Sequence, residues 1–503
     1  MQLLALAALA WLLEGARDCR RAAFWLGWVF ATAWLAGTFW WLYISLHVYG
    51  GLAAPFAVLA VAALAFALAL YYALACLLFV VVAPANLAGR ALVFAACWTL
   101  AELARGVFFT GFPWGAAGYA HVDGLLAGYA PWLGVYGIGA IAAWLALSLA
   151  RITDCGRLQR IAALMLLTLP SVAQMGQDSS PVTQSAGVLS VTLLQGNIAQ
   201  DEKFQSGSGV PDALSWYGAQ LRAARTELVV TPETSLPLLP RELPEGYWDG
   251  LRQHFGAGVG DTIKSVKSAP VPVANVASGA ALIGMPLGSL RSGYTNSVLG
   301  LQPGRIEPYR YDKHHLVPFG EFIPRFFKWF TQLLNIPLGD FNRGVVGPPA
   351  FEVRGAQGVQ RLAPNICYED LFGEELAVRF TDAATAPTIM VNVSNIAWFG
   401  NSLAIDQHLQ ISRMRTLELQ RPMIRATNTG ATAIIDHRGN VTHQLPRLTR
   451  GVLLGEVQGR SGNTFFAKWA GHFDLWPLWG LSIATLLIAF GARHRKSQTR
   501  VGL

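Results

Sequence analysis

Cys367 is the residue of this chain whose type and position most directly suggest chemistry. It lies in residues 364–370 (PNICYED), behind an expected strand, whereas the other cysteines fall in apolar segments or the short loops beside them. A single thiol in a large domain cannot form a disulfide within that domain. It is therefore either a small buried hydrophobe or a nucleophile.

Two charged residues in similar positions favour the nucleophile. Glu233 follows the expected strand 227–232, and Lys313 follows the expected strand 306–311. Taken singly, Glu233 could be a carboxylate near a helix start and Lys313 a solvated hairpin end. Because α/β domains place reactive groups at the ends of strands, the set predicts a base, a cationic electrophile and a nucleophile.

Other chemistries find less support in the sequence. His314 and His315 are adjacent, so on a strand they would point to opposite faces and could not share a metal ion. Ser394 lacks the Gly-x-Ser-x-Gly elbow of a serine nucleophile, and no glycine-rich loop of a phosphate-binding kind is present. We therefore expect neither a metal nor another cofactor.

The bulk composition indicates a membrane protein. Of the 503 residues, 53% are hydrophobic, and the mean hydropathy is +0.37. Some segments reach or approach the ~20 apolar residues needed to cross a bilayer, namely 24–46, 54–83, 126–150 and 474–491. Shorter or interrupted candidates are 2–13, 91–103 and 161–174. We interpret the first of these as a span whose beginning is missing, either because the start is misassigned or because the chain is truncated.

The positive charges predict the orientation in the membrane. Lys and Arg concentrate in alternate connections and in the tail, and the formal net charge is +8. These residues are Arg17, Arg20, Arg21, Arg90, Arg151, Arg157, Arg160, Arg493, Arg495, Lys496 and Arg500. Since positive charge is retained on the cytoplasmic side, we expect the large domain to face the periplasm. The rest of the chain is balanced in charge, so binding of nucleic acid is not indicated.

A change of composition after Pro170 divides the chain. We expect an N-terminal transmembrane helical domain of about six spans over 1–175, a catalytic domain over 176–469, and a transmembrane helix with a basic cytoplasmic tail over 470–503. Residues 261–280 are interpreted as a surface insertion.

Within the large domain, the sequence predicts strands separated in places by helices. The expected strands are 188–196, 227–232, 281–285, 295–301, 306–311, 361–367, 386–393, 423–427, 431–436 and 452–457. The expected helices are 211–226, 322–334, 373–382 and 407–420. This order predicts one layered α/β domain.

Residues 319–330 (FGEFIPRFFKWF) are dense in aromatic residues with a few cations. The segment could be a core helix. Its place directly after Lys313, in a membrane-bound chain, favours an arm that dips into the bilayer interface.

The order Glu233, Lys313, Cys367 along the chain, with the residues around each of them, resembles the nitrilase superfamily. The resemblance rests on TPE (231–233), KHHLVPFGE (313–321), CYE (367–369) and NVSNIAWFG (392–400), and is nearest to its membrane branch, the apolipoprotein N-acyltransferases. QGNI (195–198), TGFPW (110–114) and RATNTG (425–430) are also similar to that branch, so the resemblance covers nearly the whole chain.

The resemblance implies an αββα four-layer sandwich attached to a multi-span α-helical membrane domain. It also implies catalytic roles for Glu233, Lys313 and Cys367. Residues that would support the site or bind substrate are Glu321, Tyr368, Glu369, Trp398 and Phe204.

The chain departs from the family pattern at a few places. Family members usually carry one more N-terminal span. Phe204 stands where a tryptophan is usual and retains an aromatic face, and Ile396 stands where the family usually has aspartate. The change at Ile396 puts the contacts of the loop 394–400 in question. It leaves Glu233, Lys313 and Cys367 in place.

The implied reaction is the last step of bacterial lipoprotein maturation, at the inner membrane. Glu233 would take the proton of Cys367, whose thiolate is favoured by Lys313, and the sulfur would attack a phospholipid ester, expected to be phosphatidylethanolamine. The thioester would then pass its acyl chain to the N-terminal amine of a diacylated apolipoprotein. We expect a monomer that needs neither ATP nor metal.

Two alternatives remain open from the sequence. One is a membrane-anchored carbon–nitrogen hydrolase of the same superfamily, in which water replaces the amine. The other is a non-catalytic membrane protein with a decayed site. Against the second, the spans hold few ionisable groups, and we expect Glu102 and Arg105 to form a local pair near the edge of a span.

Overall fold

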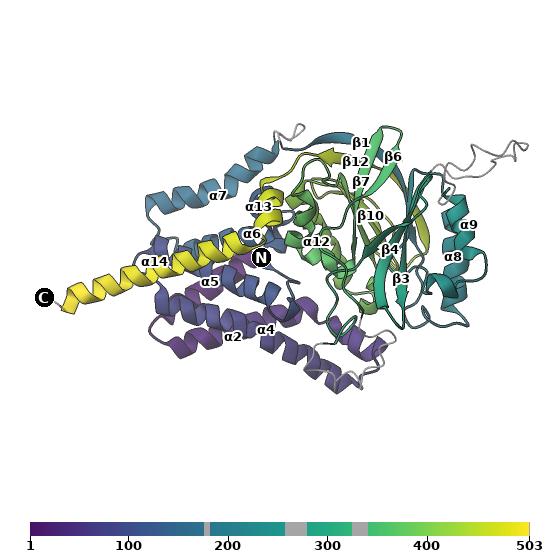
Figure 1. Cartoon of the computed structure of the whole chain (residues 1–503). Coiled ribbons are helices and arrows are strands. Elements are labelled where there is room, and N and C mark those ends of the chain that lie inside the picture. Colours follow the sequence, from purple (N-terminus) through teal and green to yellow (C-terminus); the bar gives the residue numbers. More distant parts are fainter. Residues whose placement is uncertain (176–181, 257–278, 324–340, 502–503) are drawn as a thin grey trace, which may run out of the picture. The chain divides into compact units, whose positions relative to one another are not determined.

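The computed structural model describes residues 1–175, 182–256, 279–323 and 341–501 (Figure 1). The chain forms two compact units. Unit 1 contains Met1–Tyr43, Ala53–Pro181 and Thr464–Leu503, and unit 2 contains Ile44–Leu52 and Val182–Asn463. Residues 324–330 of the expected arm and most of the expected insertion lie outside the described residues.

Unit 1 is helical. Its main helices are α1 (Gln2–Gly15), α2 (Arg20–Phe39), α4 (Ala54–Val82), α5 (Leu87–Val107), α6 (Ala130–Ala150), α7 (Arg157–Met175), α13 (Phe465–Phe473) and α14 (Trp476–Val501). Within the described residues, five segments are long and apolar enough to cross a membrane: Arg20–Phe39, Ala54–Val82, Leu87–Thr110, Ala127–Ala150 and Trp476–Arg493. The weaker candidate 91–103 is thus part of a longer helix, whereas α1, with 14 residues, is too short to be counted.

The helix observed at the expected span 24–46 ends earlier than predicted. The helix α2 ends at Phe39, and after α3 (Leu42–Ile44) the chain forms a π-helical turn, η1 (Ser45–Tyr49). This turn belongs to unit 2 together with the large domain. Apolar residues alone could not reveal this break, because the turn is itself largely apolar.

Glu102 and Arg105, close to the carboxyl end of α5, hold the loop that follows this helix. Arg105 donates from Nη1 to the carbonyls of Phe112 (2.5 Å) and Trp114 (2.8 Å). Glu102 Oε1 accepts a hydrogen bond of 2.7 Å from the N–H of Ala117. Both side chains are fully buried near the carboxyl end of α5, where they bind backbone polar groups that would otherwise be unsatisfied.

Two six-stranded sheets form the framework of unit 2. The first, in the order β12-β1-β2-β3-β4-β5, contains β1 (Gln184–Gln195), β2 (Leu228–Val230), β3 (Ala280–Ser289), β4 (Gly293–Leu301), β5 (Tyr309–Asp312) and β12 (Gly451–Ser461). The second, in the order β11-β10-β9-β8-β7-β6, contains β6 (Phe351–Gly355), β7 (Gly358–Ile366), β8 (Ile389–Ser394), β9 (Met423–Thr427), β10 (Ala433–Ile435) and β11 (Val441–Gln444). The central strands β1, β2 and β3 pair in parallel, as do β7, β8 and β9.

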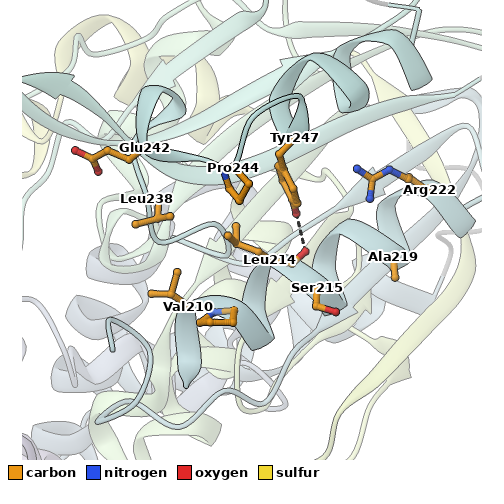
Figure 2. Close-up of a pocket in the computed structure, with 10 residues that line it drawn as sticks. Val210, Leu214, Ser215, Ala219, Arg222, Leu238, Glu242, Pro244 and Tyr247 are labelled. Carbon is orange, nitrogen blue, oxygen red and sulfur yellow. Dashed lines mark hydrogen bonds between the residues drawn. The ribbon is translucent and has the colours of Figure 1, made fainter. Parts of the chain in front are cut away.

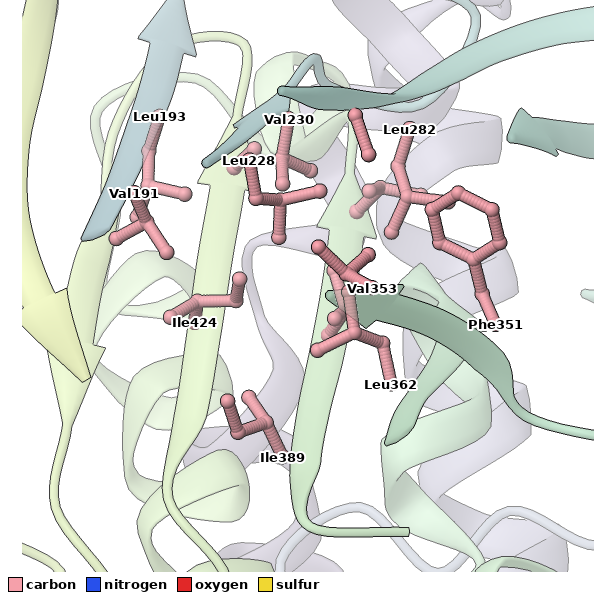
Figure 3. Close-up of a cluster of buried hydrophobic side chains, with 14 of the residues drawn as sticks. Val191, Leu193, Leu228, Val230, Leu282, Phe351, Val353, Leu362, Ile389 and Ile424 are labelled. Atoms are coloured by element: carbon pink, nitrogen blue, oxygen red, sulfur yellow. The ribbon is translucent and has the colours of Figure 1, made fainter. Parts of the chain in front are cut away.

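The main core lies between the two sheets (Figure 3). Val191 and Leu193 of β1 are alternate residues, so they point to the same face, and they belong to one buried cluster with Leu282 of β3 and with Ile389 and Ile424 of the second sheet. Each is fully buried, and burial of one such side chain stabilises the fold by about 1.5–3 kcal/mol.

Helices cover the outer faces of both sheets. On the first sheet, α8 (Gly209–Ala223) and α9 (Tyr247–His254) form a second apolar cluster with the side chains of β2, β3 and β4. On the second sheet, α12 (Ala404–Leu419) contacts β9 through hydrogen bonds from Arg425 to His408 and Ser412. The four layers confirm the expected αββα sandwich.

Each expected strand corresponds to an observed strand. The helix expected over 211–226 is α8, and the helix expected over 407–420 is α12. The helix expected over 373–382 is divided into α11 (Gly373–Ala377) and the short helix η9 (Val378–Phe380). The helix expected over 322–334 lies outside the described residues except at 322 and 323, which are not helical. The strands β6 and β11 and the helices α9 and α13 were not predicted.

Candidate active site

Cys367 follows the last residue of β7 in a backbone conformation that few residues adopt. Its φ is +53°, in the left-handed region, which costs a residue with a side chain about 1–3 kcal/mol. The chain turns there into a 3₁₀ helix, η8 (Cys367–Leu371). The half-buried thiol is therefore presented at the carboxyl end of a parallel strand, where α/β folds place reactive groups.

Glu233 reaches the site from the first sheet, just beyond β2. The segment passes so close to β3 that a Cβ at Gly284 would lie 2.2 Å from the carbonyl oxygen of Pro232, so only glycine fits there. Glu233 Oε1 accepts 2.6 Å from Nδ2 of Asn296, and Oε2 accepts 2.7 Å from the N–H of Asn395. Asn296 lies in β4 of the first sheet, and Asn395 follows β8 of the second sheet. Together these two donors fix the orientation of the Glu233 carboxylate.

Lys313 directly follows β5 and is buried between two carboxylates. Its Nζ lies 2.8 Å from Glu321 Oε2 and 3.5 Å from Glu233 Oε1. Asn296 also donates to Glu321 Oε1 at 2.8 Å, so one amide bridges both carboxylates. The structure thus brings Glu233, Lys313 and Glu321 into a single hydrogen-bonded cluster.

Burial and neighbouring charges shift the pKa values of Glu233 and Cys367 in opposite directions. Burial alone would raise the pKa of Glu233, but Lys313 and the other cation beside it, Lys203, hold that pKa below its ordinary value. Burial and the charge of Glu233 raise the pKa of the Cys367 thiol to about 12, against the opposing effects of Lys313 and Ser394. At neutral pH the Cys367 side chain is therefore a thiol, and the Glu233 carboxylate is ionised.

Lys313 itself remains an ammonium. Burial would lower its pKa, but the negative charges of Glu321 and Glu233 outweigh burial and hold the pKa above its ordinary value. It therefore supplies a permanent positive charge to the cluster.

The residue Lys203 was not predicted as part of the site. It lies in the turn after β1, is 3% exposed, and its Nζ donates 3.0 Å to the main-chain carbonyl of Glu233. A lone lysine in a loop carries no pattern that would have revealed this. The only signal was its position beside Phe204, a residue singled out by the family resemblance and half-buried in the structure.

Glu369 connects the ends of two strands from different sheets. Its Oε1 accepts from the N–H groups of His314 (2.6 Å) and His315 (3.2 Å), directly after Lys313. Its Oε2 accepts from the Tyr311 hydroxyl (2.5 Å) and the N–H of Ile366 (2.6 Å), directly before Cys367. Glu369 therefore fixes the position of residues 311–315, which carry Lys313, relative to residues 366–367.

Tyr368 and Trp398 lie in two different surroundings. The buried ring of Tyr368 packs against Phe372, with ring centroids 5.4 Å apart. Trp398 belongs to the short helix η10 (Ile396–Phe399), and its carbonyl accepts 2.7 Å from the Ser45 hydroxyl. The ring of Tyr49 stands edge-on to Trp398 at 6.0 Å. The turn η1 thus holds the tryptophan loop, a contact that the sequence did not predict.

Ile396, which stands where the family usually has aspartate, changes the contacts of its loop. Ile396 is fully buried and packs with Ile405 and Ala431. The loop that carries Asn395 and Trp398 is therefore held by apolar contacts at this position.

A groove of about 670 Å³ lies elsewhere in unit 2, between α8 and the loop that precedes α9 (Figure 2). Val210, Leu214, Leu238 and Tyr247 line it, and the Tyr247 hydroxyl donates 2.7 Å to the Leu214 carbonyl. None of the charged residues of the cluster lines this groove, so we do not assign the chemistry to it.

A cysteine, a carboxylate and a lysine at the ends of strands from two facing sheets are the arrangement expected of the nitrilase class of protein. The carbon–nitrogen hydrolase family model matches residues 190–464, and the model of the apolipoprotein N-acyltransferase N-terminal domain matches residues 1–148. Among solved structures, the carbon–nitrogen hydrolase from Helicobacter pylori G27 is similar, with a TM-score of 0.37 and 14% identity over 58% of this chain and 94% of that chain.

The chain belongs to the apolipoprotein N-acyltransferase family. It is 56% identical over 499 residues to the apolipoprotein N-acyltransferase of Verminephrobacter eiseniae, which covers 96% of this chain and 88% of that one. The corresponding protein of Ralstonia nicotianae is 44% identical over 501 residues, covering 98% and 90%, and that of Pseudomonas aeruginosa is 34% identical over 512 residues, covering 99% and 93%. The predicted activity, N-acyl transfer in lipoprotein maturation with a lipid donor and an apolipoprotein acceptor, is confirmed at the level of the family.

Proposed function

We propose that Glu233, Lys313 and Cys367 perform the acyl transfer, with a thioester on Cys367 as the intermediate. The observation that carries this proposal is the buried cluster in which Lys313 lies between Glu321 and Glu233 while the charges of Glu233 and Lys313 act on the Cys367 thiol. A base, a cation and a nucleophile in one cluster are what acyl transfer through a covalent intermediate requires.

In the first half-reaction, the thiol proton moves to Glu233 as Sγ attacks the ester carbonyl of a phospholipid. The carbonyl oxygen becomes an oxyanion, which the Lys313 ammonium and the N–H after Cys367 stabilise, an effect worth about 3–4 kcal/mol per donor. When the carbon–oxygen bond breaks, Glu233 returns the proton to the leaving alkoxide. The products are a lysophospholipid and a thioester.

In the second half-reaction, a free amine attacks the thioester carbonyl. Glu233 takes a proton from the amine as the carbon–nitrogen bond forms, and the same oxyanion donors act again. The carbon–sulfur bond then breaks, and the proton returns to Sγ. The products are an amide and the starting enzyme, and an amide is more stable than a thioester.

The other predicted residues would support these steps. Glu321 holds Lys313, and Glu369 sets the segment of Lys313 against that of Cys367. Tyr368 follows the nucleophile and packs against Phe372, and Trp398 with Phe204 would offer aromatic surface to substrate.

The donor that we propose is the sn-1 chain of phosphatidylethanolamine, and the acceptor is the N-terminal diacylglyceryl-cysteine of an apolipoprotein. We propose that the catalytic domain, residues 176–469, faces the periplasm from the inner membrane, because the basic connections and tail are retained in the cytoplasm. All residues of the cluster come from one chain, so a monomer suffices.

The test is conversion of a diacylated lipopeptide by the full-length chain in liposomes of phosphatidylethanolamine. We expect an N-acylated product with the wild-type chain and none with Glu233→Gln, which cannot accept a proton. Glu352→Gln is the matched control, because Glu352 is exposed on β6. Equal turnover by Glu233→Gln and wild type would refute the proposed base.

A further inference from the structure

A row of polar side chains crosses the second sheet on the face opposite the main core. Asn365 of β7, Asn392 of β8 and Arg425 of β9 are register partners. Their sequence neighbours Ile366 and Val393 point into the core between the sheets. Because side chains alternate along a strand, the polar row points to the opposite face, which α12 covers.

The helix α12 and the turn after Cys367 supply partners for this row. Arg425 Nη2 lies 2.9 Å from His408 Nδ1, and Arg425 Nη1 lies 3.2 Å from Asp370 Oδ2. Ser412, one turn after His408 on the same helix face, bonds to Asp370 and to Arg425. All these side chains are at most 1% exposed, so the group is a closed polar network.

The network determines where His408 carries its proton. A guanidinium can only donate hydrogen bonds, so Nδ1 of His408 must accept from Arg425. The proton of the neutral ring is therefore on Nε2. That nitrogen lies 3.2 Å from the main-chain carbonyl oxygen of Cys367 and 3.1 Å from Asp370 Oδ1, so its one N–H is shared between these two acceptors.

Two donors therefore converge on the Cys367 carbonyl, since Asn392 Nδ2 lies 3.3 Å from the same oxygen. No cis peptide bond is present among the described residues, and in a planar trans peptide the N–H points opposite to the C=O. Fixing the carbonyl toward α12 fixes the N–H of Tyr368 in the opposite direction, away from this helix.

We propose that His408 is a positioning residue for the nucleophile. Its Nε2–H holds the Cys367 carbonyl, and through the rigid peptide it holds the following N–H as an oxyanion donor. This inference rests on the proposed function, because it requires Cys367 to be the acylated residue.

The strained backbone at Cys367 and the cost of the network both support a positioning role. A φ of +53° persists in a residue with a side chain only where the surroundings impose it. A buried ion pair such as Asp370–Arg425 is often no more stabilising than apolar residues of the same volume. The network is therefore explained better by the geometry that it imposes than by stability.

Two reactions of the same sulfur separate positioning from folding. Acylation by a phospholipid develops an oxyanion, whereas alkylation by iodoacetamide displaces iodide and develops none. In the full-length chain in detergent micelles with phosphatidylethanolamine, we expect His408→Phe to slow acylation by about 10- to 100-fold. Alkylation should change by less than about threefold. Mass spectrometry of the peptide containing Cys367 measures both rates.

Two further variants serve as controls. His408→Gln places an amide N–H near the position of Nε2–H and should recover most of the acylation rate. Thr416→Val removes another buried hydroxyl from α12, one that donates only to the nearby Arg413 carbonyl, and should acylate normally.

Each result has a definite meaning. Normal acylation by His408→Phe, or an equal loss of acylation and alkylation, would overturn the positioning role. If the wild-type Cys367 peptide were never acylated, the proposed function itself would fail, and this outcome is distinct from the other two.

Discussion

The buried ammonium of Lys203 donates a hydrogen bond of 3.0 Å to the main-chain carbonyl of Glu233. The proposed base, Glu233, therefore lies between two cations, because Lys313 approaches its carboxylate at 3.5 Å. Burial lowers the pKa of Lys203 to about 8, although the negative charge of Glu233 opposes this effect. This lysine changes its charge within the range of pH in which the enzyme can be assayed.

Acylation should therefore fall as the pH rises through about 8. Below this pH, Lys203 is charged and favours the ionised forms of both Glu233 and Cys367. Above it, the charge is lost, and development of negative charge on the sulfur becomes less favourable. Single-turnover acylation between pH 6 and about 9.5 measures the profile.

Lys203→Met should lack this decline and should acylate about tenfold more slowly than wild type at pH 7, the effect of losing one charge-assisted interaction. Lys468→Met is the control, because Lys468 is exposed on α13. A decline near pH 8 that persists in Lys203→Met would have to come from another group.

Glu321→Gln should loosen Lys313 without removing any member of the triad. The substitution replaces a charged partner of Nζ at 2.8 Å by a neutral amide, so the ammonium is no longer fixed toward the oxyanion. We expect acylation to fall by about 10- to 100-fold. Thermal unfolding should show a loss of roughly 1–3 kcal/mol, because a buried hydrogen-bonded charge loses its partner.

Asn296→Asp sharpens this test. The amide of Asn296 bridges Glu233 and Glu321, and a third carboxylate there would repel both. If Glu321→Gln and Asn296→Asp both acylated at the wild-type rate, the hydrogen-bonded cluster would have no part in catalysis.

The strands could be predicted wherever apolar or β-branched residues form a run, but two edge strands could not. The strand β6 (FEVRG) and the strand β11 (VTHQ) are the outer strands of the second sheet and expose alternate or most of their residues. A strand that is paired on one side only needs no continuous apolar run, so its pattern is weak. The helix α9 was missed because its eight residues are too few for a helical period to be recognised.

Glu233, Lys313 and Cys367 could be proposed together from the sequence, because each follows an expected strand and their order along the chain resembles that of the family. Lys203, Asn296 and His408 could not, since their roles depend on contacts between segments far apart in the chain. Asn296 lay within an expected strand and His408 within an expected helix, where a polar residue usually faces solvent. The charge state of Cys367 also depended on burial, which raises its pKa and outweighs Lys313.

The orientation in the membrane can be tested with introduced cysteines, because the native Cys76, Cys97 and Cys155 are buried. In a chain lacking Cys19 and Cys367, Arg291→Cys in the exposed turn between β3 and β4 should react with an impermeant thiol reagent once the outer membrane is permeabilised. Ser497→Cys in the tail should react only after lysis. The reverse pattern would place the large domain in the cytoplasm.

The most direct test of the account is the intact mass of the full-length chain after incubation with phosphatidylethanolamine and no acceptor. We predict a gain of one acyl group that neutral hydroxylamine removes, because thioesters but not oxygen esters react with it under these conditions. Cys367→Ala should gain nothing, and Cys367→Ser should gain, slowly, an acyl group that resists hydroxylamine. Addition of a diacylated lipopeptide should discharge the wild-type thioester. An acyl group that appears equally on Cys367→Ala, or a wild-type chain that never gains one, would contradict the proposed mechanism.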